Sequence, residues 1–168
     1  MNITTKIIIT DTNIVTDLNN AHILDQFIKL DNVYISDIVK NDEINEKTGT
    51  ITLINDFKVM TATDTQLIEA SKLNIENPKL SLYDLLNFIL ARDNNCILAT
   101  GDNNLKKYSQ KNGIEVIRTL RIIKLMKDKN IISNSMAINA CNLLKECPST
   151  RIPIIDIDNL INELKKIQ

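Results

Sequence analysis

The chain has 168 residues, of which 43% are hydrophobic and 24% are charged. This length and composition are typical of one compact domain, and with only three glycines and three prolines they exclude collagen-like and linker-rich architectures. The 20 basic and 21 acidic residues give a formal net charge of −1. Such a balance excludes a protein that coats nucleic acid through bulk positive charge, so any contact with nucleic acid must come from a local patch.

The cysteine and histidine content and the absence of long apolar runs indicate the cellular compartment. Three cysteines without CxxC spacing and one histidine, His22, support neither a disulfide framework nor a Cys/His zinc site, and they suit a reducing cytosol. No stretch approaches the ~18 apolar residues of a membrane span, and the N-terminus lacks the ~7 to 15 apolar residues of a signal-peptide core. We therefore expect a soluble cytoplasmic protein that makes no membrane contact.

Short aliphatic runs alternate with segments of helical periodicity along most of the chain. The runs predict strands at 6–10, 33–35, 96–100 and 114–117, and an antiparallel hairpin that joins 51–55 to 57–60. The periodic segments predict helices at 14–30, with a break at Asn19-Asn20, from about 38 onward, at 63–73, 82–92 and 102–111. This alternation predicts an α/β fold with a mostly parallel central sheet flanked by helices on both faces.

The pattern turns wholly helical from Leu120 onward, with further helices at 136–144 and 157–167. Pro148 and Pro153 bound an extended connection between the last two helices. We therefore expect a core domain at residues 1–119 and a helical C-terminal extension at residues 120–168 that packs on the same domain.

Acidic residues follow two predicted strands and lie near the starts of two predicted helices. Asp11 and Asp102 come at strand ends, where functional groups of open α/β sheets collect. Asp42 and Glu43 lie in the helix after the second strand, and Asp84 lies one turn into the helix at 82–92. If the strands are neighbours, three or four of these carboxylates converge at one edge.

A carboxylate cluster of this kind calls for a cation. Like charges a few ångströms apart repel and raise each other's pKa values, and a hard divalent cation such as Mg²⁺ or Mn²⁺ removes that repulsion. The cation can bind a phosphate oxygen and lower the pKa of a water molecule, which are the requirements for phosphodiester hydrolysis. The alternative interpretation is that these aspartates have a structural role only: Asp11, Asp84 and Asp102 would cap helices or complement helix dipoles.

Four segments in order resemble the successive motifs of PIN-domain proteins, and the resemblance runs from about Lys6 to Thr119. The segments are Asp11-Thr12-Asn13, Ser36-Asp37-Ile38-Val39 leading to Asp42-Glu43-Ile44, Leu80-Ser81-Leu82-Tyr83-Asp84, and Thr100-Gly101-Asp102-Asn103-Asn104-Leu105. Arg151-Ile152-Pro153 followed by a terminal helix is similar to the tail of some bacterial and archaeal PIN-domain proteins. The resemblance implies a PIN-like α/β/α sandwich and a metal-dependent ribonuclease, with the VapC-like toxins of toxin–antitoxin pairs as the best-known prokaryotic branch.

The resemblance also implies which side chains would act. Asp11, Asp84 and Asp102 match three family carboxylates that would hold Mg²⁺ or Mn²⁺, and the fourth is either Asp42, by register, or Glu43, by the aliphatic residue that follows it. Three accessory positions remain. Asn104 matches a polar accessory position, and Thr100 or Asn13 could orient the carboxylates or a water molecule.

Two groups of basic residues are candidates for contact with a substrate backbone. Lys106-Lys107 lies beside the Asp102 loop and is well placed to touch it. Arg118, Arg121 and Lys124 recur at three-residue spacing, with Lys127 close by; this pattern is typical of a solvated helix face, or else of a surface that follows phosphates.

The leading hypothesis is a Mg²⁺- or Mn²⁺-dependent endoribonuclease, the toxin of a VapBC-like pair, with RNA as substrate, an antitoxin as a possible partner and a homodimer as a possible assembly. The alternative is a PIN-fold module that binds nucleic acid or protein with weak or no catalysis. An aspartate-phosphorylated protein of the phosphatase or receiver type is disfavoured, because phosphatases of the haloacid-dehalogenase type need an aspartate where this chain has Asn13.

Overall fold

The computed structural model describes residues 6–44 and 56–166. Five strands in these ranges form one sheet in the order β3-β2-β1-β4-β5, and every neighbouring pair is parallel. The strands are β1 (Ile8–Thr10), β2 (Val33–Ser36), β3 (Lys58–Met60), β4 (Ile97–Ala99) and β5 (Val116–Ile117). The predicted parallel α/β class is confirmed.

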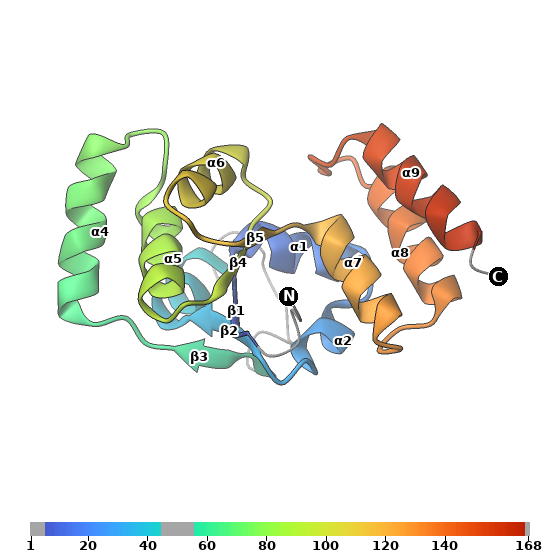
Figure 1. Ribbon diagram of the computed structural model, residues 1–168, viewed down its shortest axis with the longest axis horizontal. Coiled ribbons are helices and arrows are strands. Elements are labelled where there is room, and N and C mark those ends of the chain that lie inside the picture. The colour runs from blue at the N-terminus through green and yellow to red at the C-terminus, as the bar shows by residue number, and fades with distance from the viewer. Residues whose placement is uncertain (1–5, 45–55, 167–168) are drawn as a thin grey trace.

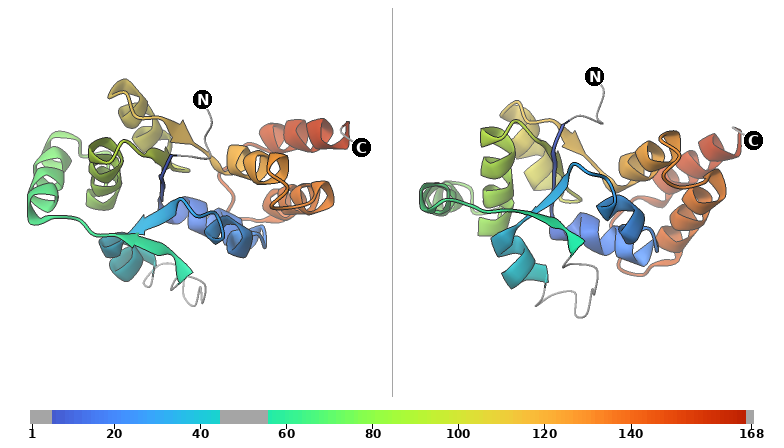
Figure 2. Two further views of the ribbon diagram at one scale, coloured as in Figure 1. Left: turned by 60° about the horizontal axis from the view of Figure 1, so that its bottom comes forward. Right: turned by 90° about the horizontal axis from the view of Figure 1, so that it is seen from below.

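Helices cover both faces of this sheet (Figures 1 and 2). On one face lie α4 (Asp64–Glu76), α5 (Leu82–Asp93) and α6 (Asn103–Lys111). On the other lie α1 (Thr12–Asn20), α2 (Leu24–Ile28) and α7 (Thr119–Asp128), with α8 (Asn134–Glu146) and α9 (Ile154–Lys165) as a further layer beyond them. None of the helices in the described ranges combines the length and the apolar character that are needed to cross a bilayer.

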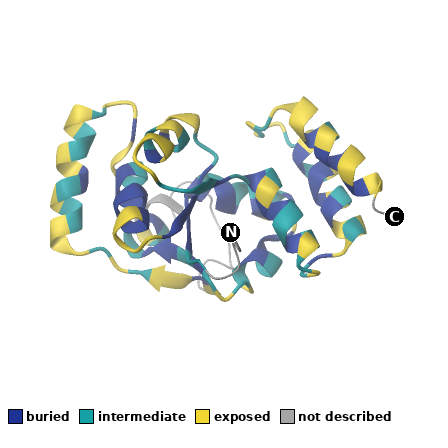
Figure 3. Cartoon of the chain, in the orientation of Figure 1, coloured by how far each residue is buried: buried dark blue, intermediate teal, exposed yellow. Residues whose placement is uncertain are grey.

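The inner strands β1, β2 and β4 are short but almost wholly buried, because they are aliphatic on both faces of the sheet, whereas the edge strand β3 is mostly exposed (Figure 3). Ile8 and Ile97 point into an apolar cluster with α1, α2 and α7, whereas their chain neighbours Ile9 and Leu98 point into a second cluster with α4, α5 and α6. The central strands are therefore fixed from both sides, which makes their carboxyl ends a rigid platform.

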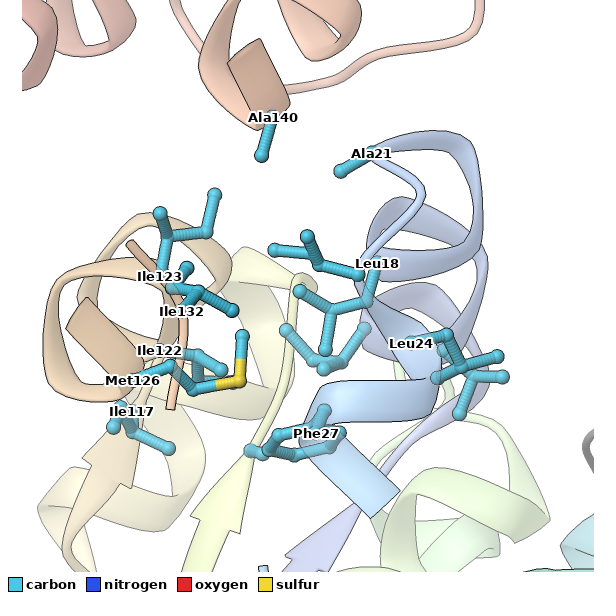
Figure 4. Packing of buried hydrophobic residues seen from close by; sticks show 14 of the residues in the cluster. Leu18, Ala21, Leu24, Phe27, Ile117, Ile122, Ile123, Met126, Ile132 and Ala140 are labelled. Carbon is cyan, nitrogen blue, oxygen red and sulfur yellow. The ribbon is translucent and has the colours of Figure 1, made fainter. Parts of the chain in front are cut away.

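The C-terminal helices share the first of these two clusters with the sheet. Ile123 and Met126 of α7 and Ala140 of α8 are buried together with Leu18 of α1 and Phe27 of α2 (Figure 4). The apolar stripes of α7 and α8 thus face the helices that follow β1, and α9 packs on α8. The division into a core at 1–119 and an extension at 120–168 stays a prediction.

Two segments differ from their sequence-based predictions or lie partly outside the described residues. The helix predicted from about residue 38 is a single π-helical segment, η1 (Val39–Ile44). The Ser36 hydroxyl accepts a hydrogen bond from the Val39 amide at 3.1 Å and so caps the start of this segment. The predicted strand at 51–55 lies outside the described residues, and β3, its expected antiparallel partner, pairs in parallel with β2.

Candidate active site

The candidate site lies at the carboxyl edge of the sheet, where β1 and β4 end side by side. Thr10 is in register with Ala99, and the Asp11 amide donates to the Ala99 carbonyl at 3.0 Å. This pairing sets the residue after β1 next to Thr100, the residue after β4. Since α5 leads into the parallel strand β4, it runs back across the sheet, and its first turn also lies at this edge.

Asp11 is the buried centre of the edge, with 3% of its surface exposed. It caps α1, because its Oδ1 atom accepts from the Ile14 amide at 2.9 Å. Its Oδ2 atom accepts from the Thr100 hydroxyl, and the Asn13 side chain supplies a further hydrogen bond. The carboxyl group is therefore held by donors from both strand ends.

Burial raises the pKa of Asp11 from 3.8 to about 7, and the negative charge of Asp84 adds to the rise. The hydrogen bonds from Thr100, Ile14 and Asn13 act in the opposite direction, because they stabilise the ionised form. Near neutral pH the group is thus poised between its two protonation states. A cation beside it would favour the ionised form and release a proton.

Thr100 connects Asp11 to Asp102. Its side chain is fully buried, and its hydroxyl donates to Asp11 while accepting from the Asp102 amide at 3.0 Å. Asp102 is half-buried and caps α6, since its Oδ1 atom accepts from the Leu105 amide at 2.8 Å. The two strand-end aspartates are neighbours through this hydroxyl.

Asp84 reaches the same edge from the first turn of α5. It is half-buried and forms a capping box with Ser81: the Asp84 amide donates to the Ser81 hydroxyl at 3.1 Å, and the Ser81 amide donates to Oδ2 of Asp84 at 2.8 Å. Its effect on the pKa of Asp11 shows that the two carboxyl groups interact electrostatically. Capping and proximity to Asp11 are thus combined in one side chain.

Asp42 and Glu43 both lie in η1, which follows β2 and packs beside α1. Because β2 is parallel to β1, the backbone of η1 is at the same edge of the sheet. The positions of these two side chains are outside what the structure describes. That Asp42 or Glu43 supplies a fourth carboxylate stays a prediction.

Among the side chains that the structure describes, in residues 6–41 and 56–166, no three of His, Cys, Asp or Glu gather into a group able to hold a metal ion. Asp11 and Asp84 nevertheless offer hard carboxylate oxygens, and Mg²⁺ commonly binds through one or two carboxylates while keeping several water molecules. Their mutual repulsion is also what a divalent cation would relieve. The donor chemistry therefore fits Mg²⁺ or Mn²⁺, and the full ligand set stays a prediction.

The predicted accessory and basic residues lie near this edge, on α6 and directly after β5. Asn104 and Lys107 are exposed on the first two turns of α6, and Lys106 is half-buried between them. Arg118, which the sequence pattern assigns to a helix face, contacts the site loop instead: its guanidinium donates to the Gly101 carbonyl and to Oδ1 of Asn103, both at 2.8 Å. Its place directly after β5, at the same edge as Asp102, is the signal that could have revealed this role.

These observations define a parallel α/β/α protein with carboxyl groups at the carboxyl edge of its central strands. The chain matches the family model DUF3368, a PIN domain, over residues 7–165, and it therefore belongs to the PIN-domain family. PIN domains are generally nucleases and typically use divalent metal ions. A search of curated proteins found no match.

The raised pKa of Asp11 makes stability depend on pH. Its pKa is about 7 in the folded protein and 3.8 when unperturbed, so the stabilising proton is fully bound in acid and is lost as pH rises through 7. Without divalent cations, raising the pH from 5.5 to 8 should lower this group's contribution to the free energy of unfolding by about 2 kcal/mol. Urea denaturation at the two pH values should show that D11N removes this loss. The exposed D31N variant is the matched control, and an unchanged pH dependence in D11N would contradict the assignment.

The Thr100 hydroxyl can be tested by a nearly isosteric change. T100V removes the donor to Asp11 and the acceptor of the Asp102 amide, so it should lower the free energy of unfolding by about 1–3 kcal/mol. The loss should be larger at pH 8 than at pH 5.5, because the ionised carboxyl group needs the donor more. T100S keeps the hydroxyl and should restore the wild-type value in the same denaturation series. A loss in T100S together with the wild-type value in T100V would show that methyl packing, and not the hydroxyl, stabilises this position.

Proposed function

We propose that this protein is an endoribonuclease that depends on Mg²⁺ or Mn²⁺ and hydrolyses phosphodiester bonds of RNA. The observation that carries the proposal is the buried Asp11 carboxyl group beside Asp84, at the strand edge of a PIN domain. Asp11, Asp84 and Asp102, with Asp42 or Glu43, are the proposed ligands of the cation.

Each side chain has a defined task in this proposal. When bound, the divalent cation neutralises charge on the phosphate and makes a water molecule more acidic. Asp11 gives up its proton on loading, and the Thr100 hydroxyl then holds the ionised carboxyl group in a single orientation. Asp84 and Asp102 are fixed by their helix caps, so little motion is required before the reaction. Lys106 and Lys107 would contact the RNA backbone.

A finer proposal concerns the biological role. We infer a VapC-like toxin that acts in the cytosol on cellular RNA, is neutralised by an antitoxin protein and forms a homodimer. The PIN-domain family and the acidic edge support this reading. Induced expression of the wild-type chain in a bacterial host should stop growth, whereas D11N at equal expression should not. Growth arrest by both variants would contradict a toxin that works by cleavage.

Cleavage itself should depend on the strand-end carboxyl groups. D11N and D102N should each reduce the rate of RNA cleavage by at least about 100-fold in Mn²⁺, since each removes charge from the proposed cation site. The measurement is single-turnover cleavage of a labelled RNA, with added EDTA as a second way to abolish activity. D31N removes one exposed aspartate and should cut at the wild-type rate.

Calorimetric titration with Mn²⁺ separates the nuclease from a PIN-fold binding module without catalysis. Saturable binding that D84N abolishes is expected for the nuclease. No Mn²⁺ binding by the wild-type chain would favour the binding module, and cleavage by D11N at the wild-type rate would exclude the proposed ligands.

A further inference from the structure

A cleft of about 520 Å³ adjoins the candidate active site on the side of β5. Asn13 and Gly101, which flank Asp11 and Asp102 in the chain, form its border with the acidic edge. A Cβ atom at Gly101 would lie 3.0 Å from Cβ of Asn13, so the two walls meet closely there. The opposite wall comes from the connection between α8 and α9, which includes Arg151 and Pro153.

Basic residues outnumber acidic ones in the lining of the cleft. Its charged residues are four basic ones, Lys106, Arg118, Arg121 and Arg151, and two acidic ones, Asp17 and Asp156. This excess of positive charge stands out in a chain whose formal net charge is −1. It is the kind of local patch through which a protein of balanced charge can contact a polyanion.

Two of the arginines are available to a ligand. Arg121 and Arg151 are exposed and form no ion pair within the described part of the chain. Arg118, by contrast, is held by Gly101 and Asn103. The cleft therefore combines one fixed guanidinium beside the acidic edge with two that can reach for phosphate oxygens.

Asp17 reduces the positive charge only in part. It accepts a hydrogen bond from the Thr119 hydroxyl at 2.6 Å, and both Arg118 and Arg151 attract its charge. Leu120, Ile152 and Pro153 add apolar surface to the same lining. The cleft thus offers both cationic groups and apolar surface to a ligand.

We propose that this cleft binds the single-stranded RNA segment next to the cleavage site, with Arg121 and Arg151 on its phosphates. The inference rests on the proposed nuclease function, because Asn13 and Gly101, which line the cleft, lie within two residues of Asp11 and Asp102 in the chain. Its volume falls within the roughly 300–1,000 Å³ of sites that enclose small molecules, enough for a short segment only. An acidic segment of a protein partner is the rival occupant, but it would not need a cleft beside the strand-end aspartates.

The test measures RNA binding without cleavage. A labelled short single-stranded RNA of mixed sequence is titrated with the full chain in EDTA and followed by fluorescence anisotropy. The R121Q/R151Q double variant should raise the Kd at least about tenfold and lower the slope of log K against log salt by about 1.4, the loss of two phosphate contacts. D156N removes a negative charge from the cleft and should lower the Kd.

Two further variants control for charge and folding. K72Q/K79Q removes two exposed lysines outside the cleft, on and just after α4, and should bind RNA as the wild type does. R121K/R151K keeps both charges and should retain most of the affinity, which a structural role of the arginines would not predict. Equal Kd values for R121Q/R151Q and K72Q/K79Q would overturn the proposal.

Two outcomes separate this proposal from the proposed catalysis and from the rival occupant. RNA binding that depends on Arg121 and Arg151, without cleavage in Mn²⁺, would support the cleft and refute the catalysis. Wild-type RNA affinity in R121Q/R151Q, together with lost binding of a glutamate-rich peptide, would overturn the cleft as an RNA site and favour a protein partner.

Discussion

The geometry of the candidate site depends on one buried carboxyl group, that of Asp11, and on the Thr100 hydroxyl that donates a hydrogen bond to it. Asp11 is removed from water at the end of β1, which costs free energy when it is ionised. Thr100 offsets part of that cost, and it can do so only because β1 and β4 are neighbours in register. The same hydroxyl holds the Asp102 amide, so a single side chain orders both strand ends.

The apolar packing explains how such short strands can keep this edge in place. Each central strand is buried between two layers, and neighbouring residues such as Ile8 and Ile9 belong to different clusters. The loops after the strands therefore start from fixed points, while their polar side chains are free to serve chemistry. The charged cleft is a product of the same packing, since α8 packs on α1, α9 packs on α8, and the connection between them brings Arg151 to the cleft beside β5.

The sequence alone predicts the elements of this fold but not all of their spatial relations. Aliphatic runs that end on Asp11 and Thr100 reveal strands, whereas the contact between these residues requires the strand order. The π-helical form of η1 has no signature in six residues. Arg118 has the spacing of a helix face, yet it precedes α7 and turns back to Gly101. The cleft depends on a chain reversal between α8 and α9 that no local pattern specifies.

The Arg118 guanidinium connects the cleft to the loop that precedes α6. Its bonds to the Gly101 carbonyl and to Asn103 tie the wall of the cleft to the backbone that presents Asp102. These two hydrogen bonds couple the position of the cleft wall to the position of the Asp102 loop. The wall of the cleft and the loop that presents Asp102 are thus held together at this position, whereas Arg121 and Arg151 leave the backbone of that loop untouched.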